Sequence, residues 1–368
     1  MSIWKSFHRF TAGALVTVLT VSGYCGAEDN STELPSGRSF RLGFASPTLG
    51  GTEDFLAAAQ KTVTEHSDIA VFHHGEEVPW EEALNGKPYT GIIAEQIRLR
   101  SELPEDHKVY VGISPLGFAR NAPSWEGKDF DDPDLVRAFT NHALRMVKEL
   151  KPDYFACGIE VNMIALSNPP GFQKYLKLSE HVYGEVKKVH PDLPVFVTIQ
   201  IDHYRKHPKA QEKALRQLLQ FSDLIAVSCY PHMEGHTPES LPKDWFASIA
   251  KLDPSKPFAI AETGYPGKDV HVNAIPPFFP NSSDFAADEQ AQTWYTRFIL
   301  EESSKLNAEF VVWFFARDFD AHIEAELKEG NRMMEFAKWW QYTGLVDRNG
   351  TSREALGLWN TWFKLPVQ

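Results

Sequence analysis

Residues 258–267 have the sequence FAIAETGYPG, in which a short apolar run delivers Glu262 to a turn of Thr, Gly, Tyr and Pro. An apolar run of this length between turn residues is typical of a buried parallel strand. Residues 154–162, YFACGIEVN, follow the same pattern, because a second apolar run ends on Glu160 and then becomes polar. A lone carboxylate in such a place is usually a helix cap or an ion pair, since burying an unused charge is costly. Two strands of one sheet that both end on Glu predict a functional pair.

The rest of the chain alternates apolar runs with helical patterns, which predicts a parallel sheet. We expect eight strands, at residues 40–46, 68–72, 109–114, 154–162, 195–201, 224–229, 257–262 and 310–315. This count predicts an α/β fold, a (β/α)8 TIM barrel, as a single catalytic domain over residues 38–366. An open doubly wound sheet shares the alternation. Its nucleotide-binding form is disfavoured, because residues 45–47 are Ala-Ser-Pro where a glycine-rich phosphate loop is needed.

Composition and the N-terminal residues indicate which partners the protein can have and in which compartment it acts. The 368 residues carry a formal net charge of −12, which argues against nucleic acid or an anionic membrane surface as a partner. Basic residues, an apolar run at 12–21 and small residues predict a signal peptide over residues 1–27, and hence a secreted or periplasmic protein. Residues 28–37 are expected to form a flexible leader. The apolar surroundings of Cys157 and Cys229 predict two buried free thiols.

Polar and aromatic side chains gather at the predicted carboxyl ends of the strands, where barrels of this kind have their active sites. The candidate site residues are His73, Glu160, Asn162, Gln200, Asp202, Tyr230, His232, Glu262 and Trp313. Each one alone has a structural explanation, such as rim packing or a hydrogen-bonded loop histidine. Together they predict an acidic site with aromatic walls. Such a site suits a polysaccharide or oligosaccharide, because sugar rings stack on aromatic rings and sugar hydroxyls need hydrogen-bond partners.

The two glutamates suit glycoside hydrolysis, which needs one protonated and one ionised carboxyl group. Strands four and seven face each other across the barrel mouth, so Glu160 and Glu262 form the predicted catalytic pair. A separation of about 5–5.5 Å between them would indicate a retaining mechanism. Tyr230 on strand six is expected to donate a hydrogen bond to ionised Glu262. We expect no metal or other cofactor, because adjacent His73 and His74 point to opposite faces and the HExxH and CxxC motifs are absent. The absence of a GxSxG motif argues against hydrolysis by a Ser-His-Asp triad.

Residues 222–231, SDLIAVSCYP, and 261–266, AETGYP, resemble the strand-six and strand-seven motifs of the family 53 endo-β-1,4-galactanases. That family belongs to clan A, a group of retaining (β/α)8 glycoside hydrolases. The resemblance implies that Glu262 is the nucleophile, Glu160 the acid/base and Tyr230 the partner of the nucleophile. It also implies that Trp313 lies under the sugar at the cleaved bond. We therefore expect a monomeric, secreted retaining β-glycosidase or endo-glycanase.

Two other hypotheses stay open. Clan A members carry an asparagine directly before the acid/base, and here Ile159 stands in that place. Either Asn162 substitutes for it or the substrate differs. In the first alternative hypothesis, Ile159 marks lost chemistry and the protein is a non-catalytic carbohydrate-binding barrel. The second alternative is a metal-dependent hydrolase that uses His232, His203 and Asp202.

Overall fold

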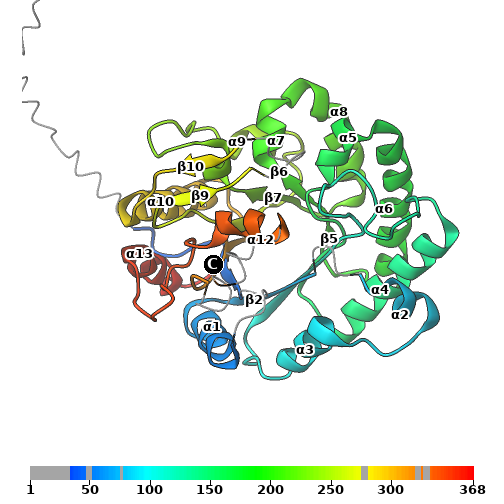
Figure 1. Ribbon diagram of the computed structural model, residues 1–368, viewed down its shortest axis with the longest axis horizontal. Coiled ribbons are helices and arrows are strands. Elements are labelled where there is room, and N and C mark those ends of the chain that lie inside the picture. Colours follow the sequence, from blue (N-terminus) through cyan, green and yellow to red (C-terminus); the bar gives the residue numbers. More distant parts are fainter. Residues whose placement is uncertain (1–33, 47–51, 75–77, 275–280, 320–324, 326–331) are drawn as a thin grey trace, which may run out of the picture. The chain divides into compact units, whose positions relative to one another are not determined.

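The computed structural model describes residues 34–46, 52–74, 78–274, 281–319, 325 and 332–368 (Figure 1). The predicted signal peptide, residues 1–27, lies outside this part of the chain. Residues 36–368 form one compact unit. In the described residues no helix is long and apolar enough to cross a membrane.

A single parallel sheet in the order β5-β4-β3-β2-β1-β11-β8-β7-β6 forms the centre of the fold. Its strands are β1 (Arg41–Ala45), β2 (Ile69–His74), β3 (Lys108–Ile113), β4 (Tyr154–Ala156), β5 (Val195–Phe196), β6 (Thr198–Gln200), β7 (Ile225–Cys229), β8 (Phe258–Thr263) and β11 (Phe310–Phe314). β5 pairs with β4 and β6 pairs with β7, and only Val197 separates them. The two short strands therefore share the fifth of eight positions. The predicted (β/α)8 barrel is confirmed.

Helices follow the strands and surround the sheet (Figure 1). The α-helices are α1 (Glu53–His66), α2 (Trp80–Asn85), α3 (Gly91–Arg100), α4 (Pro133–Leu150), α5 (Ile164–Ser167), α6 (Pro169–Val189), α7 (Ile201–Lys206), α8 (Pro208–Leu218), α9 (Ala247–Ala250), α10 (Glu289–Lys305), α12 (Arg332–Ala337) and α13 (Glu354–Phe363). Short 3-10 helices are η1 (Val161–Met163), η2 (Leu219–Phe221), η3 (Pro231–Glu234) and η4 (Lys338–Trp340). A hairpin of β9 (Val270–Val272) and β10 (Ser283–Phe285) leaves the barrel after β8.

Local signals explain where several helices begin. Thr52 Oγ1 accepts a hydrogen bond from Phe55 N at the start of α1. Asp132 caps α4 in the same way, and Pro133 occupies its first turn. Such caps satisfy backbone N–H groups that have no partner within the helix, and proline fits there because it lacks that donor.

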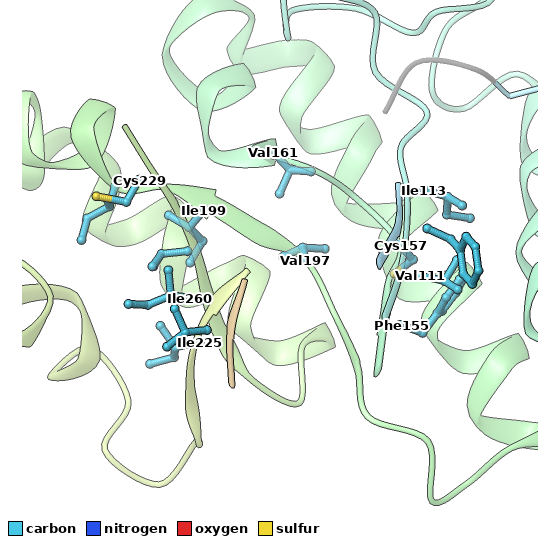
Figure 2. Close-up of a cluster of buried hydrophobic side chains, with 14 of the residues drawn as sticks. Val111, Ile113, Phe155, Cys157, Val161, Val197, Ile199, Ile225, Cys229 and Ile260 are labelled. Carbon is cyan, nitrogen blue, oxygen red and sulfur yellow. The ribbon is translucent and has the colours of Figure 1, made fainter. Parts of the chain in front are cut away.

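Alternate residues of each strand face the barrel interior or the helices, as the two-residue strand period requires. In β11, Phe310, Val312 and Phe314 belong to the interior cluster of the barrel. Val311 and Trp313 belong instead to the larger cluster between the sheet and the helices. Figure 2 shows part of this outer cluster, with Val111, Ile113, Phe155, Cys157, Val161, Val197, Ile199, Ile225, Cys229 and Ile260 labelled.

Two details of this packing bear on the sequence predictions. Cys157 and Cys229 are both buried and free, as expected. β4 is shorter than predicted, because it ends at Ala156 and Glu160 follows in a bend before η1. Glu160 therefore reaches the mouth from a loop, and Glu262 from within a strand.

The amino-terminal and carboxyl-terminal parts of the barrel meet at the beginning of its strands. Arg38 N donates to Pro366 O (2.9 Å), and Gln368 N donates to Arg38 O (3.0 Å). The Arg38 guanidinium also donates to both carboxylate oxygens of Asp68 and to Phe363 O. Because Asp68 directly precedes β2, this junction lies at the edge opposite the carboxyl ends of the strands.

Candidate active site

Glu262 lies at the carboxyl end of β8 and is only 6% exposed. Tyr230 Oη donates a hydrogen bond to its Oε2 (3.1 Å). His73 Nε2, at the end of β2, lies 2.9 Å from its Oε1. Two donors from two other strands thus hold one nearly buried carboxylate, which is how an ionised carboxylate is stabilised away from water.

Glu160 reaches the mouth through an unusual backbone path. Its φ of 54° and ψ of 36° are left-handed, a conformation that costs energy for a residue with a side chain. Glu160 N donates to Thr198 Oγ1 on β6 (2.9 Å), which fixes the bend to the neighbouring strand. Gly158 is needed just before it, because a Cβ there would overlap Tyr175 Oη and crowd Val161. The bend aims the carboxyl group into the barrel mouth, next to Glu262.

The surroundings of Glu160 shift the pKa of its carboxyl group upward. Burial raises the pKa of Glu160 to about 7, the Arg120 guanidinium lowers it, and the charge of Glu262 raises it. Arg120 Nε lies 3.5 Å from Glu160 Oε2, and both side chains are mostly buried. A negative charge that acts on a buried carboxyl group favours its protonated form, and Glu262 acts on Glu160 in this way. Glu160 therefore suits a general acid, and Glu262, with two hydrogen-bond donors, suits an ionised nucleophile.

Tyr230 is held in place by a buried carboxyl group. Asp202 Oδ2 accepts hydrogen bonds from Tyr230 N (3.0 Å) and from Gln200 Nε2 (2.8 Å). Burial raises the pKa of Asp202 to about 7, and the charge of Glu160 contributes to the rise. Burial also raises the pKa of Tyr230 well above its usual range, with a further contribution from Glu262. The phenol therefore stays protonated and donates to Glu262.

Aromatic rings pack against both hydrogen-bond partners of Glu262. The ring of Phe314, at the end of β11, meets the His73 ring edge-on at 5.4 Å between centroids. The ring of Trp340, from η4, meets the Tyr230 ring edge-on at 5.3 Å. Phe314 and Trp340 are thus the aromatic residues that pack against the partners of Glu262, whereas Trp313 was expected at this site.

Trp313 and Asn162 do not reach the carboxylate pair. Trp313 is fully buried on the helix side of β11, where its Nε1 donates to Thr343 O (2.7 Å). Asn162 is also fully buried, and its amide bonds the backbone N and O of Gln200 and the side chain of Gln211. Both predictions of a substrate contact therefore disagree with the structure. The asparagine missing at position 159 is not replaced by Asn162.

Gln200, Asp202 and His232, which were predicted to contact the substrate, have hydrogen-bond partners within the protein. Asp202 and His232 are buried, and Gln200 is partly exposed. Gln200 caps α7 by accepting a hydrogen bond from His203 N (2.5 Å). His232 is fully buried, and its Nε2 lies 3.2 Å from Trp339 O. Burial lowers the pKa of His232 to about 3, so it stays neutral. These residues support Tyr230 and the segment around Trp339, which places them behind the site.

Arg120 is the main site residue that the sequence analysis missed. It lies in the loop between β3 and α4, well beyond the last residue of the strand. In the sequence, Arg120 is recognisable only as a cationic residue in a loop at the carboxyl end of a barrel strand. No neighbouring residue in the sequence indicates that it contacts Glu160. Within the described residues, no cluster of three or more His, Cys, Asp and Glu side chains is arranged to hold a metal ion.

Comparison with solved structures finds glycoside hydrolases. This chain is similar to the exo-beta-1,4-mannosidase Op5Man5 from Opitutaceae bacterium strain TAV5, at 14% identity and a TM-score of 0.62, over 90% of this chain and 60% of that one. It is also similar to the GH53 catalytic domain from Ignisphaera aggregans, at 18% identity and a TM-score of 0.58. This match covers 92% of this chain and 98% of that one. A β-glucuronidase from Ruminococcus gnavus is similar at 12% identity and a TM-score of 0.54. This match covers 88% of this chain and 49% of that one.

At these identities the comparisons show the fold alone, and they confirm the (β/α)8 barrel. A family 53 structure is among the matches, in line with the sequence resemblance. No protein-family model and no curated protein matches the sequence.

Proposed function

We propose that this protein is a retaining glycoside hydrolase that acts on a β-linked oligosaccharide or polysaccharide. The observation that carries the proposal is the pair itself. Glu160 has a pKa raised to about 7, and Glu262 beside it accepts hydrogen bonds from Tyr230 and His73. One carboxyl group is thus suited to give a proton and the other to attack.

In this mechanism Glu160 donates its proton to the glycosidic oxygen while a Glu262 oxygen attacks C1 of the sugar. The bond between C1 and the leaving oxygen breaks as the ester between Glu262 and C1 forms. Glu160, now ionised, then takes a proton from water, and the hydroxide attacks C1 and releases Glu262. The sugar keeps its anomeric configuration because C1 is inverted twice.

The direct test is incubation with 2-fluoro-glycosides of several sugars, followed by intact mass and peptide mapping. We expect a stoichiometric sugar adduct on Glu262 and none in Glu262→Gln. Glu302→Gln is a matched control, because Glu302 is also mostly buried but pairs with Lys305 on α10. An adduct on another residue would contradict the assignment.

A second test separates the two roles. Azide added to Glu160→Ala should restore turnover and yield a glycosyl azide with the substrate's anomeric configuration, since azide then attacks the covalent intermediate. Azide added to Glu262→Ala should yield the inverted azide, because it attacks the substrate directly. Equal products from the two variants would refute these roles.

A non-catalytic carbohydrate-binding barrel is the second candidate, and Ile159 favours it. Ile159 is fully buried in the place where clan A members carry asparagine. This candidate predicts glycan binding without turnover, and binding that survives Glu160→Gln.

We further propose that the protein is exported after cleavage at residue 27, as its first residues suggest. Amino-terminal sequencing of protein from the native host tests this. A mature chain that retains residues 1–27 would contradict it. A β-1,4-galactan is the first polysaccharide to test, given the resemblance of residues 261–266 to family 53.

A further inference from the structure

Residues 332–340, which comprise α12 and η4, cross the mouth of the barrel, and we call them the mouth strap. Figure 1 shows α12, in orange, in front of the strands at the centre of the view. Phe336 of the strap meets Phe118 edge-on, with ring centroids 5.0 Å apart. Phe118 belongs to the loop after β3, whereas the strap follows β11. Since β2 and β1 lie between these strands, the contact passes over their carboxyl ends.

The strap has further anchors on the other side of the mouth. Glu335 Oε1 accepts hydrogen bonds from Asn273 N (2.6 Å) and Asn273 Nδ2 (3.1 Å), just after β9. Trp339 O lies 3.2 Å from Nε2 of His232, which belongs to η3 in the loop after β7, two residues beyond Tyr230. Neighbouring residues of one short segment are therefore tied to loops from three different strands.

The strap ends beside the catalytic machinery. Trp340 packs against Phe336 at 5.1 Å and against Tyr230 at 5.3 Å, and Tyr230 bonds Glu262. A continuous line of aromatic contacts thus runs from Phe118, across the mouth, to the partner of the proposed nucleophile. The same β3 loop also carries Arg120, whose Nε lies 3.5 Å from Glu160 Oε2.

The exposure of the carboxyl groups agrees with this arrangement. Glu262 is 6% exposed, and the side chains of Glu160 and His73 are 16% and 18% exposed. An enzyme that cuts inside a polysaccharide needs a groove open on both sides of the cleaved bond. A chain that passed through this site would have to cross the line of aromatic contacts.

We infer that the site takes the terminal sugar at the non-reducing end of a β-linked oligosaccharide and removes one unit at a time. The inference rests on the proposed function. The strap packs against the partner of Glu262, the residue that becomes bonded to the retained sugar. It therefore limits the chain on that side of the cleaved bond to a single unit. The leaving group departs on the side of Glu160.

The test uses oligosaccharides of β-linked galactose, mannose and glucose that carry a fluorescent label at the reducing end. At early conversion we expect one labelled product, shorter than the substrate by one unit, together with unlabelled monosaccharide. Labelled products of several lengths would overturn the inference and leave the proposed function standing. No hydrolysis and no 2-fluoro-glycoside adduct would overturn both.

Two variants test the strap itself. Phe336→Ala and Phe118→Ala each remove one side of the bridging contact, so each should raise internal cleavage several-fold relative to removal of terminal units. Phe298→Ala is the control, because Phe298 is also partly buried but stacks on Trp294 along α10. Thermal unfolding checks that the variants fold. An unchanged product pattern in both folded bridge variants would refute the role of the strap.

Discussion

Arg120 is expected to set the upper pH limit of catalysis. Its guanidinium is the largest influence that lowers the pKa of Glu160, which burial raises to about 7. The charged groups lie 3.5 Å apart. At an effective dielectric constant of about 20, the attraction between the two charges is about 5 kcal/mol, which corresponds to a change of about 3.5 in the pKa of Glu160 before screening by water. Because both side chains keep some exposure, Arg120→Gln should raise the pKa of Glu160 by about one to three units.

The direction of the effect follows from the role of Glu160 as an acid. Hydrolysis of a substrate with a poor leaving group requires the protonated form, so activity falls as pH rises through this pKa. Arg120→Gln should therefore shift the basic limb of kcat/KM to higher pH. Arg120→Lys keeps the charge and should leave the limb close to that of the parent. A substrate with a very good leaving group needs no acid, and serves as the internal control.

The pKa can also be followed without any substrate. Isotope-edited NMR of the glutamate side-chain carboxyl carbons, assigned with Glu160→Gln, reports the titration of Glu160 directly. A basic limb and a titration that stay in place, or move to lower pH, in Arg120→Gln would refute the electrostatic role of Arg120. If the titration of Glu160 shifts but the basic limb of kcat/KM does not, Arg120 keeps its electrostatic role and Glu160 is not the catalytic acid.

Three further predictions concern the support of the pair. Tyr230→Phe removes one hydrogen bond to Glu262 and should lower kcat/KM by about 10- to 150-fold with little change in melting temperature; an unchanged rate would contradict this. Gly158→Ala should lower the free energy of unfolding by about 1–3 kcal/mol, because the new Cβ overlaps Tyr175 Oη. Tyr175→Phe removes that oxygen, so the double variant should regain part of the lost stability in urea denaturation. Effects of the two substitutions that simply add would contradict the overlap. Asp202 has a pKa raised from 3.8 to about 7 in the folded state, so its contribution to stability is lost as pH rises from about 4 to about 7. Stability of Asp202→Asn relative to the parent should therefore rise over that range, and a flat difference would contradict the shift.

The fold was predictable because its signals are local. Each barrel strand is a short apolar run between turn residues, and each strand position was located from that pattern alone. The pair of Glu160 and Glu262 followed, because carboxyl ends of parallel strands meet at one edge. The shortness of β4 was not visible, since residues 157–159 are as apolar as the strand before them. Only the packing of Gly158 against Tyr175 shows that the chain bends there.

The remaining site residues depend on information that the sequence does not carry locally. Trp313 and Phe314 are adjacent, and a shift of one residue in register decides which of them faces the interior. Asn162 and His232 have the side chains of binding residues, but their hydrogen bonds go to backbone groups of other segments. Arg120 meets Glu160 only because the loop after β3 folds back over the mouth. These contacts arise from tertiary packing.

The junction of Arg38 with Pro366 and Gln368 makes the barrel a candidate for circular permutation. Backbone hydrogen bonds already hold the two segments together, so a short linker from residue 368 to residue 38 would span little distance. New ends can be opened at the exposed turn of residues 348–350. The joined edge lies at the end of the barrel opposite Glu160 and Glu262. Attachment of the protein to a solid support through that edge would therefore leave the mouth facing the substrate.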